Sequence, residues 1–210
     1  MSHVVLLGDS IFDNGIYVAP LPDVRAQLQA RLGSESRVTL VAVDGHVTAD
    51  VRRYQLAWIG KDATHLVISV GGNDALGYAS ILRERAGSVA EAVERLAQAQ
   101  AEFAAGYSEM LDAVLQLGLP TSVCTIYDAN YPEPQRRLVV TALALFNDVI
   151  TRAAFSRGLH LIDLRLICSA PADYANPIEP WSIGGEKIAN AIAEMVCDGG
   201  TARTMSSVWT

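Results

Sequence analysis

The sequence predicts an α/β fold, specifically a flavodoxin-like three-layer α/β/α sandwich around a five-stranded parallel sheet. Five short runs of residues are apolar almost throughout, as strands covered on both faces are. Amphipathic segments with helical spacing lie between them. Repeated strand–helix alternation implies right-handed crossovers and helices on both faces of the sheet. The expected strand order is 2-1-3-4-5.

Each element follows from its local pattern. The expected strands occupy residues 4–7, 38–43, 66–70, 122–126 and 159–162. The expected helices carry apolar residues three or four positions apart and occupy residues 24–32, 89–117, 136–157 and 183–196. We expect residues 1–197 to form a single domain. Residues 198–210 are rich in Gly, Ser and Thr without periodicity, so we expect a tail after the last helix.

Composition narrows the class of protein. The 210 residues are 50% hydrophobic and 19% charged, which is typical of a globular domain. The net charge of -7 and the lack of a Lys/Arg-rich run argue against a nucleic-acid partner. We recognise no signal peptide and no apolar run near the roughly 20 residues of a membrane span, so we expect a cytoplasmic protein with no membrane partner. The three cysteines lack Cys-x-x-Cys spacing, which predicts neither a structural zinc site nor a disulfide framework.

Glycines and short polar residues follow the expected strands. Gly-Asp-Ser (8–10) follows the first strand, Asp-Gly-His (44–46) the second and Gly-Gly-Asn-Asp (71–74) the third. A longer loop with residues 173–180 follows the fifth. Ligands of open parallel sheets bind at the carboxyl ends of the strands, so these segments predict the position of a site.

These segments resemble the conserved blocks of the GDSL, or SGNH, hydrolases, in the right order and over about residues 1–197. The third block, Gly-Gly-Asn-Asp, is the most specific part of the match. The resemblance implies that Ser10 is the nucleophile of an esterase. It also implies an oxyanion hole made by the backbone N–H groups of Ser10 and Gly45 and the side-chain amide of Asn73. Fixed donors of this kind stabilise the charge that develops on one oxygen during acyl transfer.

The last block departs from the family pattern, which reads Asp-x-x-His followed by Pro. Aligned through Pro180, this chain has Asn176 in place of the Asp and Glu179 in place of the His. His3, His65 and His160 begin or precede expected strands, which puts them at the wrong edge of the sheet. His46 is therefore the one histidine expected at the site edge.

Two residues are candidates for the general base. A histidine has the better intrinsic pKa, but Gly45 must face the oxyanion and adjacent side chains in an extended segment point oppositely. A dry site would raise the pKa of a glutamate into the useful range. We therefore favour Glu179 over His46.

The predicted function is hydrolysis of a small carboxylic ester or O-acetyl group through an acyl-Ser10 intermediate, with no cofactor. A second interpretation is a binding module that kept the pocket and lost the base. A third is a divalent-metal hydrolase that uses Asp9, Asp13 and Asp74 with Asn73. Ser10 and Asn73 could instead be ordinary helix caps. The oligomeric state does not follow from the sequence.

Overall fold

A computed structural model describes residues 2–197. It contains a five-stranded sheet in the order β2-β1-β3-β4-β5, and every neighbouring pair in this sheet is parallel. The strands are β1 (His3–Gly8), β2 (Arg37–Leu40), β3 (His65–Ser69), β4 (Thr121–Cys124) and β5 (His160–Ile162). The predicted fold class and strand order are confirmed. The expected tail at 198–210 lies outside the described residues.

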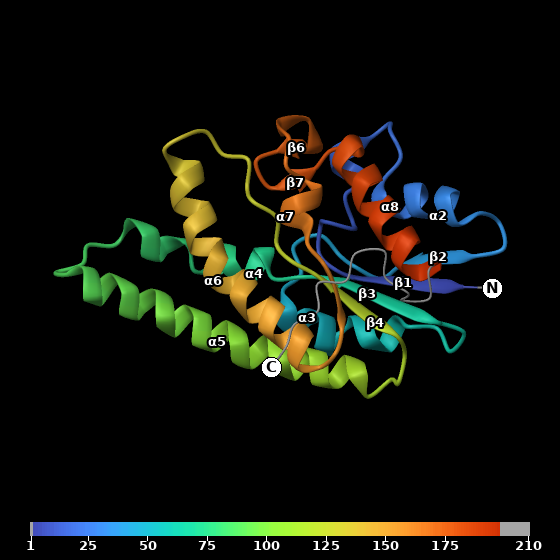
Figure 1. Ribbon diagram of the computed structural model, residues 1–210, viewed down its shortest axis with the longest axis horizontal. Helices are drawn as coiled ribbons and strands as arrows, with labels where there is room; N and C mark the ends of the chain where they lie inside the picture. The colour runs from blue at the N-terminus through green and yellow to red at the C-terminus, as the bar shows by residue number, and fades with distance from the viewer. Residues whose placement is uncertain (1, 198–210) are drawn as a thin grey trace.

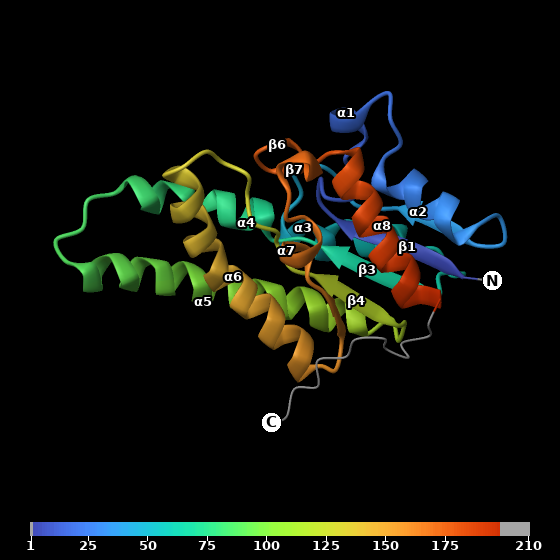
Figure 2. The ribbon, with the colours of Figure 1, turned by 45° about the horizontal axis from the view of Figure 1, so that its top comes forward.

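Helices cover both faces of the sheet (Figures 1 and 2). One face is covered by α2 (Val24–Leu32) and α8 (Ser182–Cys197), and the other by α3 (Thr48–Arg53), α5 (Val89–Leu115) and α6 (Gln135–Ser156). The short helices are α1 (Gly15–Val18), α4 (Gly72–Gly77), α7 (Leu164–Ile167) and the 3-10 helices η1 (Gln55–Trp58), η2 (Ala79–Arg83) and η3 (Pro171–Asp173). A separate hairpin pairs β6 (Tyr174–Asn176) with β7 (Glu179–Pro180). The four long helices match the sequence prediction to within two residues at each end. The short helices and the β6–β7 hairpin were not predicted.

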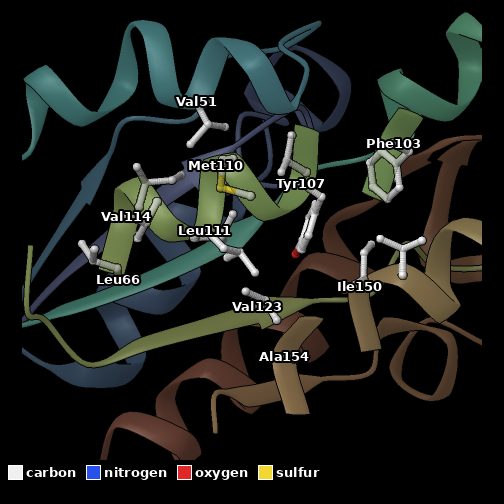
Figure 3. Close-up of a cluster of buried hydrophobic side chains, with 14 of the residues drawn as sticks. Val51, Leu66, Phe103, Tyr107, Met110, Leu111, Val114, Val123, Ile150 and Ala154 are labelled. Atoms are coloured by element: carbon white, nitrogen blue, oxygen red, sulfur yellow. The ribbon is translucent and has the colours of Figure 1, made fainter. Parts of the chain in front are cut away.

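Two apolar clusters hold the layers together. Figure 3 shows the cluster under α5, in which Phe103, Tyr107 and Leu111 of α5 contact residues of β3, β4 and α6. The second cluster joins the opposite face to α2 and α8. The apolar side chains of β1, β3 and β4 are almost completely buried, which is why these strands read as continuous apolar runs rather than alternating ones.

Strand β2 ends earlier than predicted, at Leu40 rather than Val43. The N–H groups of Val41 and Ala42 both donate to the carbonyl oxygen of Leu6, which interrupts the regular ladder. The Val43 N–H then donates to Gly8 at 3.2 Å. Apolar residues therefore continue past the strand because the segment stays buried against β1, not because it stays in regular β structure.

The end of β1 requires glycine. Gly8 has φ +127°, and a Cβ atom at this position would lie 1.7 Å from the carbonyl oxygen of Ser69 in β3. Only glycine tolerates both the backbone conformation and this approach. The close contact sets the direction in which the chain leaves β1 and enters the segment with Ser10.

Helix α6 corrects one expectation from the sequence. Among residues 2–197, it is the one helix that is long and apolar enough, by length and composition, to cross a membrane, with a mean hydropathy of 1.6 in its most apolar window. Core helices of soluble proteins pass the same test. Phe146, Ile150 and Ala154 of α6 are buried in the cluster under α5, but only 28% of the most apolar window of the helix is buried.

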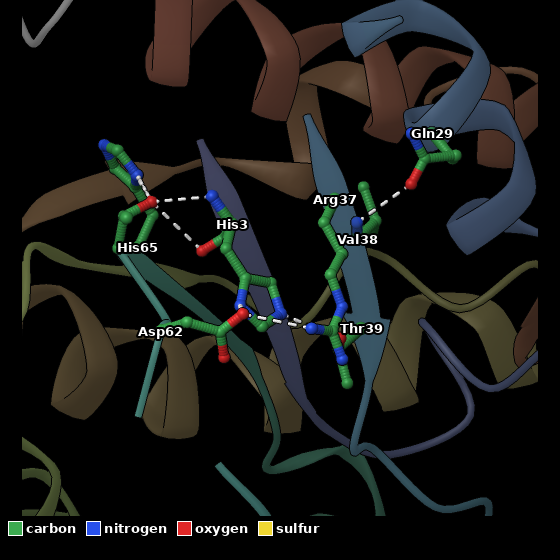
Figure 4. Close-up of polar contacts among 8 residues, drawn as sticks. His3, Gln29, Arg37, Val38, Thr39, Asp62 and His65 are labelled. Carbon is green, nitrogen blue, oxygen red and sulfur yellow. Dashed lines mark hydrogen bonds and ion pairs between the residues drawn. The ribbon is translucent and has the colours of Figure 1, made fainter. Parts of the chain in front are cut away.

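Three histidines lie at the amino ends of strands, away from the expected site. Figure 4 shows His3 bonded through Nε2 to Thr39 at 2.8 Å and paired through Nδ1 with Asp62 at 3.2 Å. His65 begins β3 and His160 begins β5. This placement agrees with the sequence argument that excluded them as partners of Ser10.

Candidate active site

A cavity of about 470 Å³ opens beyond the carboxyl ends of the strands. Ser10, Asn73 and Glu179 all line it, although they come from three distant parts of the chain. Gly45 and His46 are not among its lining residues. The structure thus brings together three of the five predicted site residues.

Ser10 lies in the turn after β1 and is buried, with 6% of its surface exposed. It does not cap a helix, because the next helix, α1, begins at Gly15 after Asn14. Asp9 behind it accepts a hydrogen bond from the Ile11 N–H at 3.1 Å, as a structural residue of this turn would. The Ser10 N–H has no acceptor among residues 2–197 and remains available to a ligand.

Asn73 is the second residue of α4, whose N-cap is Gly71, so the alternative that Asn73 caps this helix is wrong. Its Nδ2 donates to the carbonyl oxygen of His46 at 3.0 Å. An amide group has two N–H donors, so one remains for a ligand. This bond also ties the 44–47 loop to the start of α4.

Gly45 lies in that loop, is exposed and has φ +83°, a conformation that favours glycine. Its N–H has no acceptor in the described part of the chain. Although Gly45 does not line the cavity, its neighbour His46 is bonded to Asn73. The oxyanion role of Gly45 stays a prediction.

Glu179 begins β7, in a hairpin that the sequence analysis read as a loop. Hydrogen bonds fix the backbone on both sides of it: Tyr127 donates its hydroxyl to the carbonyl oxygen of Ile178 at 2.6 Å, and Asn14 donates to that of Pro180 at 3.2 Å. The prolines at 177 and 180 restrict the same segment further. The backbone that carries this carboxyl group is therefore held on both sides.

Burial raises the pKa of Glu179 to about 7, against the lowering effect of a hydrogen bond from the Ser10 hydroxyl. The charge of Asp44 raises this pKa further. Glu179 is 5% exposed, and its Oε2 atom has no hydrogen-bond partner among residues 2–197. A carboxyl group with this pKa exchanges protons near neutral pH, as a general base must.

A second buried acid lies beside the first. Burial raises the pKa of Asp9 to about 8, and the charge of Glu179 adds to this rise. Asp9 therefore carries its proton at neutral pH, which limits the negative charge at this end of the cavity. The deprotonated form of Glu179 is correspondingly easier to form than it would be next to a charged Asp9.

His46 has a structural partner that the sequence analysis missed. Gln55 of η1 is completely buried, and its Nε2 lies 3.0 Å from His46 Nδ1. The same amide donates to the Gly8 carbonyl at 2.7 Å and accepts from the Gly8 N–H at 2.8 Å. Because the amide nitrogen can only donate, His46 Nδ1 accepts and the ring proton sits on Nε2. Gln55 thus joins the end of β1 to the loop with Gly45, and no sequence motif marks it.

The remaining predicted polar residues have local partners. Asn176 is exposed, and its side chain accepts a hydrogen bond from the Ile178 N–H at 2.9 Å, so it closes the hairpin turn. Asp13 accepts from the Asp44 N–H at 2.9 Å, and Asp74 from the Thr48 N–H at 3.0 Å. Within residues 2–197, no cluster of three His, Cys, Asp or Glu side chains has metal-binding geometry.

The cavity therefore holds a buried hydroxyl group beside a carboxyl group whose pKa is about 7, with a free N–H and an amide donor nearby. This set has the elements of acyl transfer: a nucleophile, a base and donors for an oxyanion. The site is also dry enough for the base to differ from an ordinary glutamate.

Comparisons with known proteins agree with this geometry. The model of the GDSL-like lipase/acylhydrolase family matches residues 6–182. The extracellular lipase of Streptomyces rimosus shares 20% identity over 91% of this chain and 99% of its own, with a TM-score of 0.66. A putative arylesterase from Agrobacterium tumefaciens shares 17% identity over 94% of this chain and 99% of its own, with a TM-score of 0.67. A carbohydrate acetylesterase from Sinorhizobium meliloti shares 14% identity over 94% of this chain and 99% of its own, with a TM-score of 0.65. No curated protein matches the chain significantly. At these identities the solved structures establish the fold.

Proposed function

This chain belongs to the GDSL-like lipase/acylhydrolase family, and we propose that it hydrolyses a carboxylic ester through an acyl-Ser10 intermediate with Glu179 as the base. The observation that carries the proposal is that Ser10 and Glu179 line the same cavity, with the Ser10 hydroxyl close enough to the Glu179 carboxyl group to lower its pKa. A serine hydroxyl is a poor nucleophile unless a neighbouring group accepts its proton. The alignment through Pro180 predicts that Glu179 stands where the family has histidine.

In the acylation step, Ser10 Oγ bonds to the ester carbonyl carbon while its proton passes to Glu179. The carbonyl electrons move onto oxygen, which the Ser10 N–H and the free Asn73 N–H receive. Gly45 joins them if its loop moves to the cavity. When the tetrahedral intermediate collapses, the bond to the alcohol oxygen breaks and Glu179 returns the proton to that oxygen.

Deacylation repeats the same proton path with water. Glu179 takes a proton from a water molecule as this attacks the acyl carbon. Collapse then breaks the bond to Ser10 Oγ, which regains the proton and releases the carboxylic acid. The two half-reactions need no cofactor, and the substrate is a small molecule held by the cavity.

Covalent labelling tests the proposal directly. A fluorophosphonate should react with the purified protein, and peptide mapping should place the adduct on Ser10. The Ser10→Ala variant should neither label nor turn over a short-chain activated ester, while its circular dichroism spectrum and Tm match those of the wild type. Equal turnover by the variant would exclude Ser10 as the nucleophile.

The alternative of a non-catalytic binding module rests on the turn role of Asn176 and on the absence of histidine from the cavity lining. A wild-type protein that neither labels at Ser10 nor hydrolyses any ester would favour it.

A further inference from the structure

The cavity is larger and more apolar than an acetyl ester requires. Beyond Ser10 it continues between α4 and η2 on one side and α6 on the other. The apolar side chains along this path include Leu76, Leu82, Leu138, Val139, Leu143 and Phe146. Its volume of about 470 Å³ is in the range of sites that enclose whole ligands.

The two ends of the cavity carry different ionisable groups. We call the end with Asp9, Ser10 and Glu179 the inner end, and the end with Arg83 and Gln135 the outer end. Arg83 is the last residue of η2 and Gln135 is the first of α6. Figures 1 and 2 show that η2 and the start of α6 lie together on the side of the molecule away from β1. Arg83 is the one cationic side chain in the lining.

Arg83 has no ion-pair partner among residues 2–197. Its acidic neighbour Glu84 is paired with Arg95 at 2.6 Å and does not line the cavity. Exposed Arg136 and Arg137, which follow Gln135, add positive charge beside the outer end. This local excess contrasts with the net charge of -7 of the whole chain.

We propose that the substrate is an amphiphilic ester whose apolar chain lies between η2 and α6 and ends in an anionic group held by Arg83. This inference rests on the proposed function and names the substrate class of the same site. Apolar walls favour the chain, since each methylene that leaves water strengthens binding about three- to fourfold. The guanidinium group is suited to a carboxylate or phosphate. In its deprotonated form, which the proposed reaction needs, Glu179 repels such a group from the inner end, so the charges also orient the substrate.

Para-nitrophenyl esters of increasing chain length test the apolar part. At concentrations below aggregation, kcat/KM for the decanoate ester should exceed that for the acetate ester by at least about tenfold. Ala142→Phe places a ring in the cavity and should lower this ratio by about tenfold. Ala144→Phe is the matched control, because Ala144 is an exposed residue of the same helix and does not line the cavity. A ratio that does not depend on the residue at position 142 would overturn the chain placement.

A carboxylate at the chain end tests Arg83. The wild type should prefer the mono-para-nitrophenyl ester of sebacic acid to the decanoate ester of equal length. Arg83→Gln should lower this preference at least about tenfold, the effect of losing a hydrogen bond to a charged group, and Arg83→Glu should reverse it. Arg85→Gln is the control, since Arg85 is exposed and lies outside the cavity lining.

The charged chain can belong to either half of the ester. A second substrate pair, decyl acetate and the acetate ester of ω-hydroxydecanoic acid, places it in the alcohol half. A preference confined to one pair identifies which half enters the cavity, and a preference in neither pair would overturn the role of Arg83. These outcomes differ from a failure of the proposed function. In that case even the acetate ester would not be hydrolysed, and the fluorophosphonate would not label Ser10.

Discussion

Ser10 and Glu179 line one cavity, with the Ser10 hydroxyl close enough to the Glu179 carboxyl group to lower its pKa, although the two residues lie near opposite ends of the chain. The turn after β1 positions the first and the β6–β7 hairpin positions the second. Neither segment alone makes a site. Their meeting in the cavity makes Glu179 the candidate proton acceptor for Ser10.

Replacement of Glu179 by Gln tests that acceptor. Gln keeps the size of the side chain but cannot take a proton near neutral pH, so kcat/KM should fall at least about tenfold. His46→Ala should have a smaller effect, because His46 does not line the cavity and its Nδ1 is bonded to Gln55. Steady-state rates of ester hydrolysis by both variants decide whether Glu179 or His46 is the base. An active Glu179→Gln protein beside an inactive His46→Ala protein would make His46 the base.

The pH dependence of kcat/KM should follow the ionisation of Glu179. Burial raises its pKa to about 7, and only the deprotonated form accepts the Ser10 proton. The rate constant should therefore rise with pH below about 7 and level off above it. Measurements of kcat/KM from about pH 5 to about pH 9 should show this rise in the wild type. If kcat/KM of the Glu179→Gln variant rises with pH in the same way, a group other than Glu179 controls the pH dependence.

Asn73→Ala tests the oxyanion donor. The free N–H of Asn73 gains its main interaction only when negative charge develops on the carbonyl oxygen, so kcat should fall by about 10²–10³ with a smaller change in KM. Loss of the bond to the His46 carbonyl is a structural side effect, so the Tm of the variant serves as the control. A defect confined to KM would make Asn73 an ordinary substrate contact.

The sequence predicted the part of this architecture that depends on local patterns. Buried parallel strands read as apolar runs, and their order placed Ser10 and Asn73 at one edge of the sheet. Alignment through Pro180 singled out Glu179, and the structure puts this residue in the same cavity. Gln55 was missed because its partners lie nine and 47 residues away and its own segment carries no motif.

Elements made of few residues were also missed. The β6–β7 hairpin and α4 are too short to show a period, and tertiary contacts hold them in place. The apolar cavity was equally hidden in the sequence. Its walls come from residues 75–83 and 135–146, and the second of these segments reads only as a helix with an unusually apolar composition.

Gln55→Leu should destabilise the protein. The side-chain amide of Gln55 bonds the Gly8 N–H beyond the point at which β2 ends. A leucine leaves this buried N–H without a partner, at a cost of about 1–3 kcal/mol. Urea unfolding measures the loss, and Gln98→Leu on the exposed surface of α5 is the control. Equal stability of the two variants would contradict the role of Gln55.

Asp9→Asn should alter the pH dependence of stability in a defined direction. Burial raises the pKa of Asp9 from 3.8 to about 8, so between these values the folded protein holds a proton that the unfolded chain releases. The free energy of unfolding of the wild type should therefore fall, relative to that of Asp9→Asn, as pH rises through this interval, and the difference should level off above about pH 8. The asparagine oxygen can still accept from the Ile11 N–H, which preserves the turn. Because Glu179 contributes to the raised pKa, the comparison should be repeated in the Glu179→Gln background, where the fall in stability persists but levels off at a lower pH. A stability difference that is constant from about pH 4 to about pH 8 would show that Asp9 is already ionised in the folded protein, and that the inner end of the cavity carries more negative charge than its burial implies.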